Sequence, residues 1–127
     1  MSGVLLDTHV ALWLLGEPDR LGAKTKALLA TEPVWVSAAS LWEVAIKSQL
    51  GKLTVAADIT QALADSGVRE LAIGWRHLEA YGAAALPHRD PFDAILVAQA
   101  LHERLRFLTV DRAILSAGLP FVINAID

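Results

Sequence analysis

The chain has 127 residues, 54% of which are hydrophobic, and its 11 basic and 14 acidic residues give a net charge of −3. This length is typical of one domain, residues 1–127, with a sizeable core. Disulfides and thiolate metal sites are excluded because the chain has no cysteine, and no apolar run approaches the roughly 20 residues that a membrane span needs.

The first half of the chain alternates short apolar runs with segments of helical periodicity. In chain order these predict a strand at 4–6, a helix at 10–15 that ends at Gly16 and Pro18, a helix at 23–30, a strand at 34–36, and a long helix from a Ser37 or Ser40 cap toward Gly51. Asp7 and His9 interrupt the N-terminal apolar run, so it does not predict a signal peptide. The lack of cysteine fits a reducing cytoplasm.

The second half continues the alternation. It predicts a helix from Asp58 to Gly67, a strand at 70–73, a helix at 76–84, a helix from Asp90 to about Arg104, a strand at 107–110, a short helix from Asp111 to Gly118, and a strand at 121–123. Pro91 after Asp90 favours a helix start, because proline at the first helical position needs no amide partner. The helix that follows is apolar on nearly every face, so we expect it to be deeply buried.

Strands that alternate with helices favour parallel pairing with right-handed crossovers. The sequence therefore predicts an α/β fold, a three-layer α/β/α sandwich with a central, mostly parallel sheet. Sites in such sheets lie at the carboxyl ends of the strands. Asp7 and Asp111 directly follow two strands and so fall at this edge. Each also has a structural alternative, as the cap of the next helix.

Glu43 is a third candidate, with two structural alternatives. Ser40 and Glu43 match a capping box, in which each side chain satisfies an amide of the other residue. Glu43 is also placed to form a surface ion pair with Lys47 at i+4. Against both, helical spacing places Glu43 on an apolar stripe, where an uncompensated charge is rare.

Asp90 and Asp93 open the helix of "HRDPFDAILVAQA". Asp90 is the expected N-cap. Asp93 lies at the third helical position, where the helix dipole favours an acid. Its neighbours at i+3, i+4 and i+7 are apolar, so it faces the sheet, and this direction makes Asp93 the stronger functional candidate.

Four acids at or facing one edge of one sheet favour a joint explanation. Two carboxylates about 4 Å apart repel by roughly 4 kcal/mol at an effective dielectric near 20. Either their pKa values rise or cations bind between them. Oxygen ligands in an open site suit Mg²⁺ or Mn²⁺. Two such ions can activate water and stabilise a leaving oxygen, which predicts phosphodiester hydrolysis.

Other side chains give weaker signals. His9 is close enough in sequence to reach this site, whereas His77 and His102 fall on polar helix ends and are expected at the surface. The four tryptophans are more typical of core or interface anchors than of base-stacking platforms, and Trp13 or Trp42 is the first candidate for an interface. The mean hydropathy of +0.43 exceeds what a small monomer needs, which favours an oligomer or a protein partner.

The segments "LLDTHVALWLL", "VSAASLWEVAIK", "LPHRDPFDAILVAQA" and "LTVDRAIL" together resemble the PIN-domain family, particularly the VapC-type toxins of toxin–antitoxin pairs. The resemblance covers essentially the whole chain. It implies a PIN fold, a four-acid Mg²⁺ or Mn²⁺ site, and endoribonuclease activity on structured RNA such as tRNA. It also implies a homodimer, and a cognate antitoxin that lays a C-terminal segment across the site.

The resemblance assigns the family's four acids, in order, to Asp7, Glu43, Asp93 and Asp111, which then serve as both catalytic and metal-binding residues. Asp90 and Thr8 are auxiliary candidates. Many relatives have a basic residue after the third acid, where this chain has Ala94. The contact to the RNA phosphate would then come from Arg89, Arg112 or Lys47.

Net charge alone argues against a nucleic-acid partner. However, if divalent cations neutralise four of the acids, the net charge changes from −3 to +1. The alternative function is a non-catalytic binding module, either a PIN-like scaffold or a receiver-like signalling domain. A receiver is disfavoured because a single Asp7 ends the first strand and no Lys follows residue 52, and a degenerate scaffold would be expected to lack one of the four acids.

Overall fold

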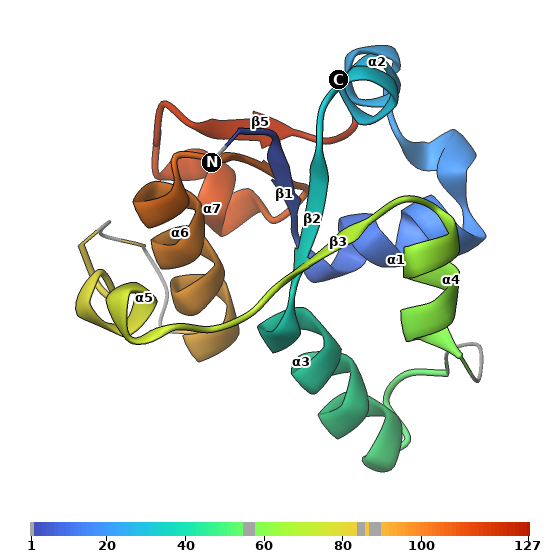
Figure 1. Ribbon diagram of the computed structural model, residues 1–127, viewed down its shortest axis with the longest axis horizontal. Helices are drawn as coiled ribbons and strands as arrows, with labels where there is room; N and C mark the ends of the chain where they lie inside the picture. The colour runs from blue at the N-terminus through green and yellow to red at the C-terminus, as the bar shows by residue number, and fades with distance from the viewer. Residues whose placement is uncertain (1, 55–57, 84–85, 87–89) are drawn as a thin grey trace.

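One five-stranded parallel sheet organises the fold. The computed structural model describes residues 2–54, 58–83, 86 and 90–127. The strands are β1 (Val4–Leu6), β2 (Val34–Ser37), β3 (Arg69–Leu71), β4 (Arg106–Thr109) and β5 (Val122–Asn124). They are ordered β3-β2-β1-β4-β5 (Figure 1), and all four pairings are parallel, as the alternation of strands and helices predicts.

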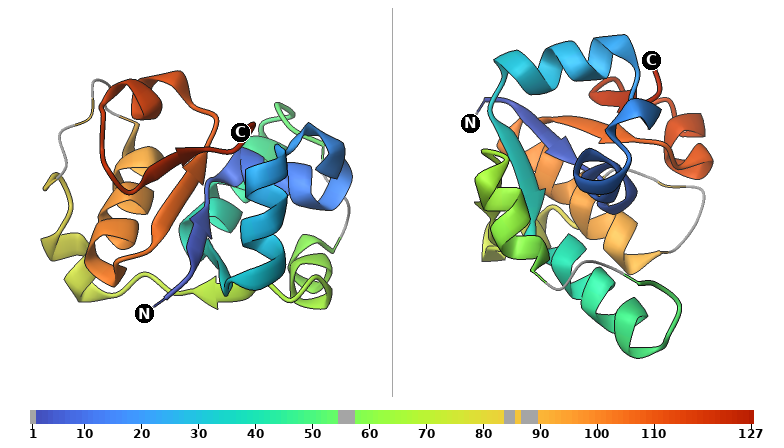
Figure 2. Two further views of the ribbon diagram at one scale, coloured as in Figure 1. Left: turned by 90° about the horizontal axis from the view of Figure 1, so that it is seen from above. Right: turned by 90° about the vertical axis from the view of Figure 1, so that its right-hand side faces the viewer.

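Helices cover both faces of this sheet (Figure 2). They are α1 (Thr8–Gly16), the 3-10 helix η1 (Pro18–Arg20), α2 (Ala23–Thr31), α3 (Ala38–Gln49), α4 (Ile59–Asp65), α5 (Trp75–Glu79), α6 (Pro91–Glu103) and α7 (Arg112–Ser116). Figure 2 shows α6 and α7 on one side of the strands and α1, α2 and α4 on the other. The predicted three-layer sandwich is confirmed.

Two apolar clusters fill the spaces between the sheet and these layers. Val4 and Leu6 of β1 point into the cluster that holds α1, α2 and α4, whereas Leu5 points into the cluster under α6 and α7. This alternation follows from the two-residue period of a strand. Strand β1 is fully buried on both faces, as expected for the central strand of a parallel sheet. The residue after it is therefore held in a rigid frame.

The strand order decides which residues become neighbours at the carboxyl edge. Because β1 pairs with β4, with Leu6 opposite Leu108, Asp7 comes to lie beside Thr109. The Asp7 N–H donates to the Leu108 carbonyl at 2.9 Å. The order also differs from the 2-1-3-4-5 order of receiver domains. The receiver-like alternative is therefore wrong.

Helix α5 departs from its prediction. It ends at Glu79 instead of extending toward residue 84, which lies outside the described residues. The following turn brings Gly82 to φ +83°, a conformation that a helix does not allow. Nor does His77 lie at the surface as expected, because α5 packs against α6 and buries its ring. There Nδ1 accepts from the Gly74 N–H at 2.9 Å and Nε2 lies 2.9 Å from the Glu103 carboxylate.

Within the parts of the chain that the structure describes, no helix has both the length and the apolar composition needed to cross a bilayer.

Candidate active site

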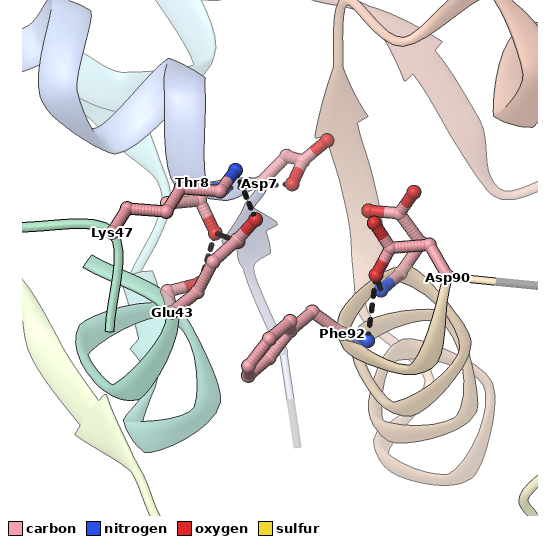
Figure 3. Close-up of polar contacts among 8 residues, drawn as sticks. Asp7, Thr8, Glu43, Lys47, Asp90 and Phe92 are labelled. Atoms are coloured by element: carbon pink, nitrogen blue, oxygen red, sulfur yellow. Dashed lines mark hydrogen bonds and ion pairs between the residues drawn. The ribbon is translucent and has the colours of Figure 1, made fainter. Parts of the chain in front are cut away.

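Five carboxylates line one cavity at the carboxyl edge of the sheet. Asp7 follows β1, Asp111 follows β4, Glu43 comes from α3, and Asp90 and Asp93 come from the beginning of α6. The cavity has a volume of about 320 Å³, and His9, Lys47 and Val110 complete its described lining. Figure 3 shows Asp7 and Glu43 on one side of the gap and Asp90 on the other. All four predicted acids are thus gathered in one place.

Asp7 is buried at the centre of this edge and is only 4% exposed. One carboxylate oxygen accepts from the Thr8 N–H at 2.7 Å and the other from the Thr109 hydroxyl at 2.5 Å. Burial raises the pKa of Asp7 above its ordinary value, while these two hydrogen bonds lower it, Glu43 raises it and His9 lowers it. Asp7 does cap α1, but a helix cap alone would not need to be buried beside a second acid.

Glu43 is held by contacts from two helices. Thr8 at the start of α1 donates its hydroxyl to Glu43 Oε1 at 2.7 Å and lies 3.0 Å from the Ser40 hydroxyl. Lys47 donates to the other carboxylate oxygen at 2.7 Å. Thr8, predicted as an auxiliary residue, thus orients a predicted ligand.

The capping-box interpretation of Ser40 and Glu43 is wrong. Helix α3 begins one turn earlier, where the Ser37 side chain accepts from the Ala39 N–H at 3.0 Å. Ser40 is therefore inside the helix. Its partner is Thr8, which is distant in sequence. The predicted pair with Lys47 is present, but it is not a surface pair, because Glu43 is 6% exposed.

Lys47 brings a cation to the cavity. The hydrogen bond to Glu43 raises the pKa of Lys47 above its ordinary value. Desolvation opposes this shift, and the charges of Glu43, Asp90 and Asp93 add to it. The ammonium group is therefore held in the combined field of the acids from α3 and α6.

Asp90 has the predicted role of helix cap. Its carboxylate accepts from the N–H groups of Phe92 at 2.8 Å and Asp93 at 3.2 Å, and Pro91 occupies the first helical position. Asp93 is 8% exposed at the first turn of α6, where the helix dipole stabilises a negative charge. The cap thus fixes the backbone that carries Asp93.

Thr109, which the sequence patterns do not single out, links the two acids that follow strands. Besides donating to Asp7, its hydroxyl accepts from the Asp111 N–H at 3.0 Å. The Asp111 carboxylate in turn accepts from the Ile114 N–H at 3.0 Å and caps α7. The position of Thr109 could have been inferred from the sequence, because a threonine at the end of a strand can accept a hydrogen bond from the backbone N–H two residues later, here that of an acid.

The three candidates for phosphate contacts are placed differently. Lys47 lines the cavity, as does His9, which was expected to be within reach. Arg112 is exposed at the beginning of α7 and does not belong to the cavity lining. Arg89 lies outside the described residues.

The donor chemistry of this cavity fits a hard divalent cation, because it offers carboxylate oxygens from four elements around one space. The buried Asp7, beside Glu43, adds an incompletely compensated negative charge. As the side chains stand in the described residues, however, no three Asp, Glu or His groups are arranged to hold a metal ion. Asp7, Glu43 and Asp111 face protein donors instead, so metal binding requires side-chain rotation and partial release of Lys47.

Comparisons with known proteins identify the family. Residues 4–118 match the PIN domain family. A Mycobacterium tuberculosis protein named Ribonuclease VapC22 is 32% identical over 124 residues, which cover 94% of this chain and 95% of the relative.

Two solved structures share the fold. A toxin–antitoxin complex from Klebsiella pneumoniae matches with a TM-score of 0.65 and 22% identity, over 97% of this chain and 98% of that one. VapBC2 from Rickettsia felis, bound to a DNA fragment from its promoter, matches with a TM-score of 0.67 and 16% identity, over 97% and 96%. The sheet order, the acidic cavity and these similarities agree: the chain belongs to the PIN-domain family, where it is related to the VapC proteins.

Proposed function

We propose that this chain is a divalent-metal-dependent endoribonuclease, the toxin of a toxin–antitoxin pair, and that it hydrolyses phosphodiester bonds of tRNA or another structured RNA in the cytoplasm. The observation that carries the proposal is the convergence of five carboxylates, from four separate elements, on one cavity. The relationship to a protein named as a ribonuclease supports the same activity.

In this proposal Asp7, Glu43, Asp93 and Asp111 hold Mg²⁺ or Mn²⁺. The bound ions would supply a water activated for in-line attack and stabilisation of the leaving oxygen. The residues around these acids position them: Thr8 orients Glu43, and Asp90 fixes the turn that bears Asp93. These hydrogen bonds fix the elements that carry the acids, while the carboxylates of Asp7, Glu43 and Asp111 would still have to rotate away from their protein donors to reach the ions.

Lys47 is the strongest of the proposed phosphate contacts. Its side chain is 40% exposed, so the ammonium group is accessible from the mouth of the cavity while it compensates Glu43. Arg112, exposed at the start of α7, would contact a phosphate farther along the RNA, and Arg89 remains a candidate from the sequence. Neutralising Arg89 and Arg112 together should flatten the salt dependence of RNA binding, and an unchanged slope would contradict this assignment.

The cognate antitoxin would reach the site from a neighbouring groove. A cavity of about 690 Å³ runs along α1 and α4, is lined by Leu12, Trp13, Leu15 and Ile59 among others, and shares His9 with the acidic cavity. An apolar helix of the antitoxin would fit this groove. A basic segment that follows the helix would then lie against the five acids. This geometry supports inhibition by a segment laid across the site.

We also propose a homodimer. Exposed apolar side chains gather on and after α5, where Trp75 is 87% exposed and Leu78 and Tyr81 are about half exposed. Large apolar side chains left exposed within a few positions of one another favour a protein interface. Sedimentation of the wild type and of a Trp75→Ala variant tests this assembly, which the variant should weaken.

Cleavage by the purified chain tests the proposed activity. The wild type should cut a tRNA mixture with Mg²⁺ or Mn²⁺ but not with EDTA, and Asp93→Asn should not cut under any of these conditions. Asp19→Asn makes the same charge change at a fully exposed side chain and is the matched control. A wild type that leaves RNA intact with either metal would favour the alternative, a non-catalytic PIN-like scaffold. An active Asp93→Asn would contradict the site assignment.

A further inference from the structure

Trp42 and Glu43 are adjacent in α3 but have opposite environments. Glu43 is 6% exposed and lines the acidic cavity, whereas the indole of Trp42 is 61% exposed. Successive residues of a helix point about 100° apart, so the tryptophan lies around the helix from the carboxylate and outside the described lining of the cavity. A core role does not account for so large an apolar side chain left in solvent.

Phe92, on α6, contacts the Trp42 ring. The two rings meet edge to face, with centroids 5.2 Å apart and planes at 76°. The Phe92 N–H donates to the Asp90 cap. Figure 3 shows the Phe92 side chain reaching from α6 toward α3, below the gap that separates Glu43 from Asp90. The aromatic pair therefore joins the two helices that supply three of the five acids.

The charge of the site favours a nucleobase, and not a phosphate, as the ligand of the Trp42–Phe92 pair. Five carboxylates face Lys47 in the described cavity lining, and the whole chain carries a charge of −3. Even with four of these acids neutralised by bound cations, which leaves a net charge of +1, attraction of phosphates is weak compared with that of strongly basic nucleic-acid-binding proteins. Stacking of a base on an aromatic ring adds affinity without cationic residues. A phosphodiester in the cavity would also bring its flanking bases close to the rim.

We propose that Trp42, oriented by Phe92, is a stacking platform for an unpaired nucleobase that flanks the cleaved phosphodiester. This inference rests on the proposed ribonuclease function and deepens it. A base that is free of a duplex can stack on a side chain without the cost of breaking its pair and leaving its neighbours. The platform therefore favours cleavage in a single-stranded loop or end, with little preference for base identity.

The test measures binding without cleavage. Proteins in an Asp93→Asn background, with Mg²⁺, are titrated into a fluorescein-labelled oligouridylate of about ten nucleotides and into versions with one abasic residue at each position, and anisotropy is recorded. One stacked base contributes about 1 to 3 kcal/mol, so Trp42→Ala should weaken binding of the intact RNA at least about fivefold. Trp42→Phe should retain most of the affinity.

The abasic series makes the test specific. One abasic position should weaken binding to the background protein and leave binding to the Trp42→Ala protein unchanged, because the ring that it would contact is absent. Leu50→Ala removes another exposed side chain from the end of the same helix and should change neither affinity nor position dependence. Within the background protein the abasic comparison alters only the RNA, so the position dependence itself does not depend on how a variant folds.

Two results would overturn the proposal. One is a Trp42→Ala protein that binds as tightly as its background and keeps the same abasic profile. The other is a change of oligomeric state on sedimentation for Trp42→Ala but not for Leu50→Ala, which would make the ring an interface between copies. Failure of the proposed function is distinct: the wild type would not cut RNA with Mg²⁺, whatever the binding of the variants.

Discussion

Replacing Thr109 with valine removes one hydroxyl from the centre of the site and little volume. Thr109 is fully buried, donates to the Asp7 carboxylate, and accepts from the Asp111 N–H. A hydrogen bond to a charged group contributes about 1.5 to 3 kcal/mol, and a buried N–H left without a partner costs about 1 to 3 kcal/mol. We therefore expect Thr109→Val to lower the free energy of unfolding by about 2.5 to 6 kcal/mol, the two contributions taken together.

Thr25→Val is the matched control for this substitution. Thr25 is also fully buried, but its hydroxyl has no hydrogen-bond partner in the described structure. Removing an unpartnered buried hydroxyl should be neutral or stabilising. Urea unfolding at neutral pH in EDTA measures both variants. Equal stabilities of Thr109→Val and Thr25→Val would refute the bridging role of Thr109.

Thr109→Val should also change the pH dependence of cleavage. The Thr109 hydrogen bond lowers the pKa of Asp7, against the larger effect of burial. Removing that bond raises this pKa further, so a smaller fraction of Asp7 is ionised at a given pH. The acid limb of the kcat/KM profile should therefore move to higher pH. An unchanged limb would mean that Asp7 does not control it.

Three further substitutions test separate parts of the account. Asp7→Asn should abolish cleavage without lowering stability at pH 7 in EDTA. The free energy of unfolding of the wild type should fall as pH rises from about 3.8 toward the raised pKa of Asp7, because the buried carboxyl must ionise. Asp7→Asn should lack this decline. A decline that persists in the variant would mean that Asp7 is not its source. Lys47→Gln should weaken RNA binding and reduce the salt slope by about 0.7, whereas an equal slope would remove Lys47 from the phosphate contacts. Asp90→Asn should keep the stability of α6, because asparagine also caps helices, and should reduce cleavage less than Asp93→Asn; equal losses would make Asp90 a ligand.

The parts of the site that follow strands could be predicted from the sequence. Asp7 and Asp111 come directly after short apolar runs, and parallel strands bring their carboxyl ends to one edge. The Asp90–Pro91 pair likewise predicts the beginning of α6 from local chemistry alone. In each case the signal lies within a few residues of the acid, where sequence patterns are most reliable.

The contacts that orient the acids depend on tertiary structure, and the sequence did not reveal them. Ser40 and Glu43 fit a local capping box, yet Ser40 packs against Thr8, 32 positions away. Thr109 reaches Asp7 only because β1 and β4 are neighbours. His77 is buried because α5 packs on α6, an arrangement that helical periodicity over five residues does not encode.

Metal binding by the acidic cavity is the central claim, and calorimetry tests it most directly. MnCl₂ is titrated into the metal-free wild type, Asp7→Asn, Asp93→Asn and the surface control Asp19→Asn. We predict binding by the wild type and the control, and affinities that are lower by roughly 10- to 100-fold or more in the two site variants. Equal Mn²⁺ affinity in all four proteins, or no binding to the wild type, would contradict it.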